Sequence, residues 1–262
     1  MTMRIRRLAV TGAALVALAG LSACTAKDTP ATTGAGASAG APAVESTAGA
    51  PSDASKELAA AATKLTSSSG KIHMTMTGGM TGEGAFDTPN RVVDMTMALA
   101  GFGDISVRQI GTDLYVKVGG AAAKSFGTKW MHLDASKMPA TSALSLEKND
   151  PRNSAKMLES STDVKKTGDG KFAGTIDITK SPTATAEMLK GLAGKTTQVP
   201  FTAEVDGDGN LSRMSLDMDS VAQGAGKVDA IYSDIGSKVT VAAPAKAQTI
   251  EMSDSALKSI GG

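Results

Sequence analysis

The feature that most restricts the fold of this chain is a series of segments in which apolar and polar residues alternate. The clearest segment runs from Arg91 to Leu99, where alternate positions are occupied by Val93, Met95, Met97 and Leu99. A period of two places neighbouring side chains on opposite faces of a strand. Comparable segments cover residues 71–77, 80–87, 104–110, 114–118, 130–134, 162–166, 172–178, 199–205, 214–218, 227–235 and 239–241. Short turns separate many of them, so we predict an antiparallel meander with one apolar and one solvated face.

Four stretches show helical spacing instead, which makes the expected fold class α+β. The first starts at Ser52 or Asp53, carries Leu58 and Leu65 on one face, and ends before Gly70. Two more are expected over residues 138–146 and 151–159, the second with an Asp cap and Pro at its first position. A short fourth helix follows Ser181.

The first 24 residues predict export and lipidation. Three arginines precede an uncharged apolar run over residues 8–19, which has the form of a signal peptide and is too short for a comfortable membrane span. The run ends in Leu21-Ser22-Ala23-Cys24, which resembles a bacterial lipobox. Cys24 would then carry a diacylglyceryl group, with palmitate on the anchor, and become the mature N-terminus. It is the only cysteine, so an internal disulfide is excluded.

Composition divides the chain into four parts. Residues 1–23 form the signal peptide, and residues 24–52 form a disordered tether of Ala, Gly, Ser, Thr and Pro, which buries too little apolar area to fold. Residues 53–252 form the folded domain, and residues 253–262 a frayed tail. We therefore expect a monomer held on the extracytoplasmic side of the cell membrane by its lipid anchor.

The charge balance and the aromatic content argue against a nucleic-acid partner. Removal of three signal arginines from 27 basic residues leaves 24 against 26 acidic residues. Aromatic residues make up 3% of the chain, too few to build a base-stacking platform.

Several apparent chemical motifs fail on inspection, so we expect no enzyme activity, no cofactor and no metal. The Asp206-Gly207-Asp208-Gly209-Asn210 segment lacks the later positions of a calcium loop and is better interpreted as a hairpin turn. The Gly194-Lys195-Thr196 segment lacks the first glycine of a phosphate loop, and Ser68 and Lys71 lack companion motifs. The two histidines, His73 and His132, fall on the polar side of their strands and are interpreted as surface residues.

Methionines are concentrated on the apolar side of the expected strands. The sequence holds 14 methionines, and several alternate with polar residues on segments that should be neighbours. One interpretation is that they simply fill the core; the other is that they form an adaptable lining for apolar ligands. The candidate ligand-binding positions are Met74, Met76, Val93, Met95, Met97, Leu99, Ile105, Val107, Leu114, Val116, Met157, Met188, Leu192, Met214, Leu216 and Met218.

The order of these segments resembles a known lipoprotein family. The lipobox, tether and first helix are followed by the phrases Gly70-Lys71-Ile72-His73-Met74-Thr75, Gly82-Glu83-Gly84-Ala85-Phe86, Leu114-Tyr115-Val116-Lys117 and Lys129-Trp130-Met131-His132-Leu133-Asp134. Together they are similar to the actinobacterial LppX/LprA/LprF/LprG lipoproteins, which share the fold of the LolA and LolB carriers. The resemblance implies a strongly curved antiparallel β half-barrel, LolA-like, with helices packed on the concave face and an acyl-chain pocket between them. Cys24 is the only residue whose role it assigns.

Two functions from different classes are therefore expected. The first is binding, and transfer, of acyl lipids, glycolipids or lipoglycans in an apolar cavity, in partnership with an envelope transporter. The second is a surface lipoprotein that binds a protein or senses the state of the envelope without a lipid ligand.

Overall fold

The described part of the chain is built around one large sheet. The computed structural model describes residues 52–138, 152–181, 184, 190–191 and 196–252. Within these ranges the strands are β1 (Ser69–Met76), β2 (Met80–Asp87), β3 (Val92–Leu99), β4 (Gly103–Ile110), β5 (Asp113–Val118), β6 (Trp130–Asp134), β7 (Thr162–Gly168), β8 (Lys171–Asp177), β9 (Gln198–Val205), β10 (Leu211–Asp217), β11 (Lys227–Ser233) and β12 (Thr249–Glu251).

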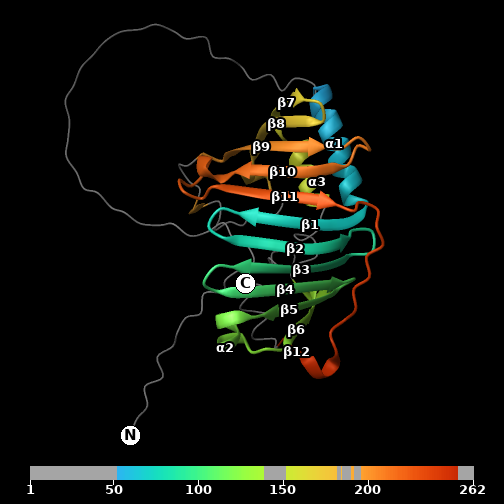
Figure 1. The fold of residues 1–262 in the computed structure, drawn as a ribbon, viewed down its shortest axis with the longest axis vertical. Coiled ribbons are helices and arrows are strands. Elements are labelled where there is room, and N and C mark those ends of the chain that lie inside the picture. The colour runs from blue at the N-terminus through green and yellow to red at the C-terminus, as the bar shows by residue number, and fades with distance from the viewer. Residues whose placement is uncertain (1–51, 139–151, 182–183, 185–189, 192–195, 253–262) are drawn as a thin grey trace, which may run out of the picture.

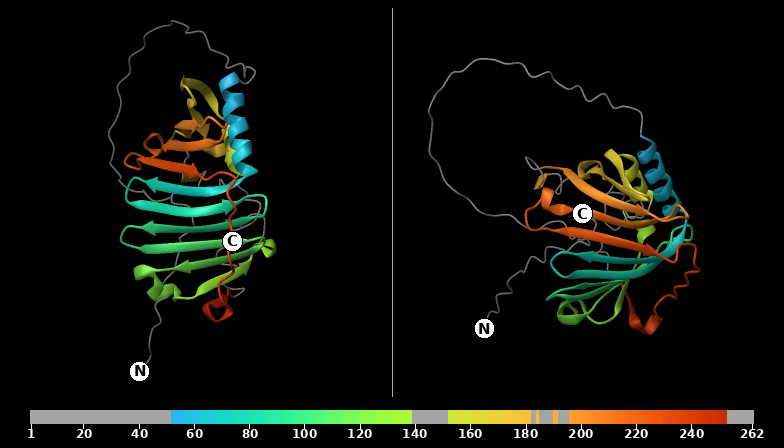
Figure 2. Two further views of the ribbon diagram at one scale, coloured as in Figure 1. Left: turned by 45° about the vertical axis from the view of Figure 1, so that its right-hand side comes forward. Right: turned by 45° about the horizontal axis from the view of Figure 1, so that its top comes forward.

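These strands form an open twelve-stranded sheet in the order β12-β6-β5-β4-β3-β2-β1-β11-β10-β9-β8-β7 (Figure 1). Neighbouring strands are antiparallel except β12 and β6, which are parallel. The prediction of a mostly antiparallel sheet with helices is confirmed, with one parallel pair at the edge as a correction. The sheet is bent rather than flat (Figure 2).

Tight turns join β1 to β5 in sequence order, and a longer connection over residues 119–129 leads to β6. At the first hairpin, Gly78 and Gly79 have φ angles of 100° and 87°, which residues with a Cβ adopt at a steric cost. Each pair then alternates in strict register, so that Met74 lies opposite Gly82 and Gly82 lies opposite Met97. Residues directly opposite one another share a face, so the apolar positions of successive strands form one continuous surface.

Helices cover the apolar face at one end of the sheet. The helices are α1 (Asp53–Thr66), α2 (Ala123–Phe126) and α3 (Arg152–Glu159), and short 3₁₀ turns are η1 (Gly120–Ala122), η2 (Ala135–Lys137), η3 (Ile178–Lys180), η4 (Met218–Ser220) and η5 (Lys246–Gln248). The Ser52 hydroxyl caps α1 by accepting a hydrogen bond from the Ser55 amide at 3.1 Å. Leu58 of α1 and Leu158 of α3 are buried in one cluster with Phe172, Ile176 and Phe201 of β8 and β9.

Two further clusters continue the core. Leu114 and Val116 of β5 pack with Leu133 and Ala135 near the β6 end of the sheet. Ile178, Val199 and Met218 form a smaller cluster around the turns that follow β8 and β10. The apolar interior therefore extends along the sheet, and only its β7 to β10 end is covered by α1 and α3.

Three strands end in the same way. Asp134, Asp177 and Asp217 close β6, β8 and β10, and each side chain accepts a hydrogen bond from an amide two residues later, at the start of η2, η3 or η4. The repeated Asp cap turns the chain out of the sheet at the end of each of these strands.

The C-terminal segment corrects one predicted strand. Residues 239–241 belong to no strand; they lie in the stretch over residues 234–248, which we name the C-terminal strap, between β11 and β12 (Figure 1). Its start is held by the Gly236 amide, which donates to the Ser69 carbonyl at 2.8 Å, and its middle by Arg108, which donates to the Ala242 carbonyl at 3.3 Å. The alternating pattern was present, but this stretch crosses the sheet instead of joining it.

Other expectations concern residues that the structure does not describe. These include the signal peptide, Cys24, the tether, the tail, most of the helix predicted over residues 138–146 and most of the helix predicted after Ser181. The helix predicted over residues 151–159 is present as α3. None of the helices in the described ranges is long and apolar enough to cross a membrane.

Candidate functional site

Four methionines from three neighbouring strands converge on the apolar face. Met74 and Met76 of β1, Met80 of β2 and Met97 of β3 line a shallow depression whose volume is about 10 Å³, room for about one water molecule. The remaining lining residues are Thr75, Thr81, Gly82 and Val228. All four methionine side chains are half-buried, so their thioether groups are neither packed away nor fully in water.

Gly82 creates the space between these side chains. It lies opposite Met74 on one side and Met97 on the other. A Cβ added at this position would lie 3.5 Å from Met97 Cγ and 3.6 Å from Met74 Cβ. Side-chain atoms of Met74 and Met97 therefore surround a position that has no side chain of its own. We name the space lined by Met74, Met76, Met80 and Met97 around Gly82 the methionine depression.

The predicted lining continues from the depression toward β5. Met95 and Met97 lie opposite Val107 and Ile105 of β4, and Val107 lies opposite Val116 of β5. Ile105 and Val107 pack against the cluster that contains Leu114 and Val116. Val93 and Leu99 occupy the same face at the two ends of β3, opposite Phe86 and Met80 of β2.

The predicted positions on the other side have different surroundings. Met157, Met214 and Leu216 pack against the cluster formed by α1, α3 and β7 to β10. Met218 begins η4 instead of ending β10, and it is buried with Ile178 and Val199. Met188 and Leu192 lie outside the described residues. The structure thus brings the predicted positions of β1, β3, β4 and β5 together on one part of the apolar face. Met157 of α3 and the β10 positions Met214 and Leu216 belong instead to the cluster that the helices cover.

Two apolar side chains of the lining were not among the predicted positions. Met80 and Val228 reach the methionine depression because β2 and β11 both pair with β1. The alternation of Met80 with Gly82 and Gly84 was visible in the sequence. The neighbour relation of β11 and β1 was not, because it joins segments far apart in the chain.

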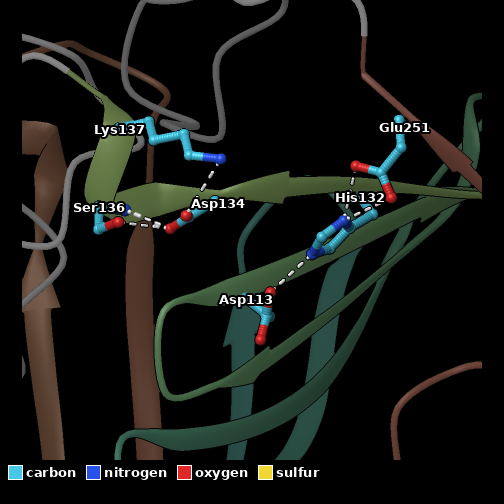
Figure 3. A network of polar contacts seen from close by, with 6 residues as sticks. All are labelled: Asp113, His132, Asp134, Ser136, Lys137 and Glu251. Atoms are coloured by element: carbon cyan, nitrogen blue, oxygen red, sulfur yellow. Dashed lines mark hydrogen bonds and ion pairs between the residues drawn. The ribbon is translucent and has the colours of Figure 1, made fainter.

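The opposite, polar face carries a network that the sequence did not predict (Figure 3). His132 Nε2 lies 2.8 Å from Asp113 Oδ1, and His132 Nδ1 lies 2.8 Å from Glu251 Oε2. Its ring stacks on Tyr115 with a centroid separation of 4.7 Å. The His132 side chain is 17% exposed and is fixed by its two carboxylate contacts, so it is not the free surface histidine expected from the strand pattern.

The network shifts two pKa values. Burial lowers the pKa of His132, but hydrogen bonds to Asp113 and Glu251, together with their negative charges, outweigh burial and raise this pKa above its ordinary value. The pKa of Tyr115 is also raised, first by burial and then by the charges of Asp113 and Glu251.

Next to this network, two cations lie within cation–π distance of the Trp130 ring. Arg108 Cζ is 5.0 Å and Lys117 Nζ 6.0 Å from the ring centroid. Arg108 also donates to Asp94 at 3.1 Å. These groups tie β3 to β6 across the polar face.

Metal ligation and sequence comparison assign no further role to these residues. Among the residues that the structure describes, no group of three or more His, Cys, Asp or Glu side chains is arranged to hold a metal ion. No protein-family model matches the chain, and no curated protein matches it.

Solved structures show a distant similarity. The Mycobacterium tuberculosis lipoprotein LppX aligns at 17% identity with a TM-score of 0.47, over 73% of this chain and 100% of that chain. An uncharacterized conserved protein from Thermus thermophilus aligns at 7% identity with a TM-score of 0.42, over 77% of this chain and 100% of that chain. At TM-scores below 0.5, neither similarity assigns a function to this chain.

Proposed function

We propose that this chain is an extracytoplasmic lipoprotein, anchored to the cell membrane through Cys24, that binds acyl lipids on the apolar face of its sheet. The observation that carries the proposal is the methionine depression, where half-buried Met74, Met76, Met80 and Met97 surround Gly82. The thioether groups of these four methionines remain accessible to a ligand, whereas Met218 is buried in the core at 3% exposure. Thioether side chains adapt to apolar partners of irregular shape, which suits a flexible acyl chain.

The physical basis of binding would be removal of apolar surface from water. Each Å² of apolar surface that is buried contributes about 25 cal/mol, so a chain lying along β1 to β4 gains free energy in proportion to its length. In the proposed complex the sheet acts as a half-barrel, with its helices and the acyl chain on the concave face, and the polar head stays at the rim. The tether lets the domain move between the bilayer and an envelope transporter. Its ligands would include lipoglycans or glycolipids.

The first test is native mass spectrometry of the full chain, purified from an actinobacterial host and followed by organic extraction. A stoichiometric acyl lipid that dissociates from the protein supports the proposal. The lipid on Cys24 is covalent, so a Cys24→Ser variant separates anchor from ligand. A protein mass without ligand, and no uptake of added phospholipid or glycolipid, would contradict it.

A cavity-filling variant sharpens the test. Gly82→Leu should fill the methionine depression and lower lipid occupancy, because the new side chain takes the space between Met74 and Met97. Gly207→Leu is the matched control, since Gly207 is exposed in the β9–β10 turn and a Cβ there meets nothing within 4 Å. Equal lipid occupancy in the two folded variants would place the ligand elsewhere.

The alternative is a surface lipoprotein that recognises a protein or senses the envelope without a lipid. It predicts a ligand-free domain together with a specific protein partner that survives purification, and the mass-spectrometry experiment distinguishes it from the first proposal.

A further inference from the structure

The strand β12 is held to the sheet by few contacts. It spans three residues and pairs in parallel with β6, and the following Met252 amide donates to the His132 carbonyl at 2.9 Å. Ile250 is 43% exposed, so its burial adds little. A parallel pair of this length is weak by itself. Apart from the packing of Met252 against the cluster that contains Leu114, the side-chain contact between Glu251 and His132 is therefore the main interaction that fastens β12.

The geometry of His132 specifies its protonation state. One ring nitrogen lies 2.8 Å from Asp113 and the other 2.8 Å from Glu251, on opposite sides of the ring (Figure 3). An ionised carboxylate only accepts hydrogen bonds, so both ring nitrogens must carry a proton. A neutral imidazole has one N–H, and its other nitrogen would face a carboxylate with no proton between them.

The contact that opens on deprotonation is the one to Glu251. Asp113 is the first residue of β5 and pairs directly with Asp134 of β6, so the β5–β6 ladder fixes its position. Glu251 belongs to the short edge strand, and its side chain is 77% exposed. Its carboxylate can leave the ring for water without disturbing another strand.

The groups around the ring agree with this assignment. Asp113 and Tyr115 face the ring from β5, and Glu251 faces it from β12. On β6 itself, the Asp134 carboxylate accepts a hydrogen bond from Ser136 and forms an ion pair with Lys137. The pKa of His132 is lowered by burial but raised more strongly by its two carboxylate partners. A raised folded-state pKa means that the stabilisation is complete below the unfolded pKa and is lost as pH rises through the folded pKa.

We propose that β12 is a pH-operated latch, in which doubly protonated His132 fastens Glu251 to the β6 edge and releases it when the imidazole becomes neutral. Release has two consequences. It exposes the hydrogen-bonding edge of β6, and it frees Met252 from the apolar cluster that contains Leu114 and Leu133. The latch depends on the contacts of β12 alone and holds whether or not a lipid binds.

Hydrogen exchange of the full chain in detergent micelles tests the latch directly. Amide protection factors of Ile250, Glu251 and Met252, corrected for intrinsic exchange, are measured from about pH 5.5 to about pH 8.5, a range that brackets the ordinary histidine pKa. Protection should fall as pH rises, by about tenfold for each unit that separates the pKa of His132 with β12 in place from its pKa with β12 released. The single tryptophan, Trp130, lies opposite Thr249 and gives an independent fluorescence reading of the same transition.

Three variants test whether the pH dependence of β12 protection comes from the contact between His132 and Glu251. Glu251→Gln should keep β12 protected at high pH, because an amide can pair with a neutral imidazole in either tautomer. His132→Gln should remove the pH dependence. His73→Gln is the matched control, since His73 also lies on the polar face and faces a glutamate, Glu83, at 3.3 Å, but lies on β1. Protection that does not change with pH in the unmodified chain, or a pH dependence that persists in His132→Gln, would overturn the latch.

Discussion

At the scale of single residues, two glycines on the same face of β2 have different tolerances. A Cβ at Gly84 would lie 2.6 Å from the Asp94 carbonyl oxygen and 3.0 Å from Met95 Cα, both in the backbone of β3. Gly84→Ala should therefore push β2 and β3 apart and lower the free energy of unfolding by about 1–3 kcal/mol. Urea unfolding measures the change.

Gly82→Ala is the control for this prediction. Its new Cβ would meet side-chain atoms of Met97 and Met74 at 3.5 Å or more, which is ordinary van der Waals contact. Because alanine also reduces the entropy of the unfolded chain, Gly82→Ala should be neutral or slightly stabilising. Equal destabilisation by the two substitutions would show that the β2–β3 spacing is not the limiting contact.

Asp206 organises the turn between β9 and β10. Its carboxylate accepts hydrogen bonds from the Asn210 amide at 2.8 Å and the Asp208 amide at 3.0 Å, and these bonds hold its pKa below the ordinary value. Asp206→Ala should lower the free energy of unfolding by about 1–3 kcal/mol, because it removes the partner of Asn210, which is 9% exposed.

The effect of Asp206→Ala should depend on pH. A depressed folded-state pKa contributes stability above the unfolded pKa and loses it as pH falls through the folded value. The difference between the two proteins should therefore shrink in acid. Thermal unfolding at a series of pH values measures it, and a difference that grows in acid would contradict the carboxylate's role.

At the scale of elements, α1 is docked through a small apolar face. Leu58 is 1% exposed in the cluster with Phe172 and Phe201. Leu58→Ala should lower the free energy of unfolding by about 2–5 kcal/mol, since it leaves a cavity beneath the helix. Lys56→Ala is the control: the Lys56 side chain is 65% exposed, so the change should stay within about 0.5 kcal/mol. Chemical denaturation compares them, and similar losses would mean that α1 is not held by Leu58.

The sequence predicted strands better than it predicted their partners. Met95 and Met97 could be assigned to one face because a strand has a fixed period of two. Residues 239–241 show the same alternation yet join no strand, because Arg108 and Ser69 hold the strap outside the ladder. Periodicity predicts which side chains of a segment share a face. Whether the segment joins the sheet depends on hydrogen bonds to residues that are distant in the sequence.

The polar network was beyond sequence analysis for a related reason. His132 and Glu251 are 119 positions apart and meet only because β12 adds to β6 in parallel. Strand parity placed His132 on the polar face correctly. Nothing in a single sequence identified Glu251 as its partner, so the histidine was interpreted as an ordinary surface residue.

At the scale of the whole molecule, the described apolar face has two parts. Its β7 to β10 end is covered by α1 and α3, while the β1 to β4 part carries the methionine depression. The predicted positions Met214 and Leu216 belong to the covered part and Met74, Met76, Met95 and Met97 to the other. A test of ligand binding should therefore alter the second part and leave the helix-covered core intact.

The double substitution Met95→Asp and Met97→Asp meets this requirement. Both side chains are half-buried, so the new carboxylates stay hydrated in the empty protein and the sheet should still fold. A bound acyl chain would strip that water from the carboxylates, and burying an unpaired charge is very costly. Lipid occupancy in native mass spectra should therefore fall by more than about tenfold, the change that 1.4 kcal/mol produces.

Thr96→Asp is the matched control for the double substitution, because Thr96 lies between the two methionines on the exposed polar face of β3. It adds the same kind of charge to the same strand without entering the methionine depression, so lipid occupancy should not change. If the double variant has native-like circular dichroism and keeps its lipid, the ligand does not lie on this face. If Thr96→Asp loses lipid equally, the loss results from destabilisation of β3, and the methionines do not contact the ligand.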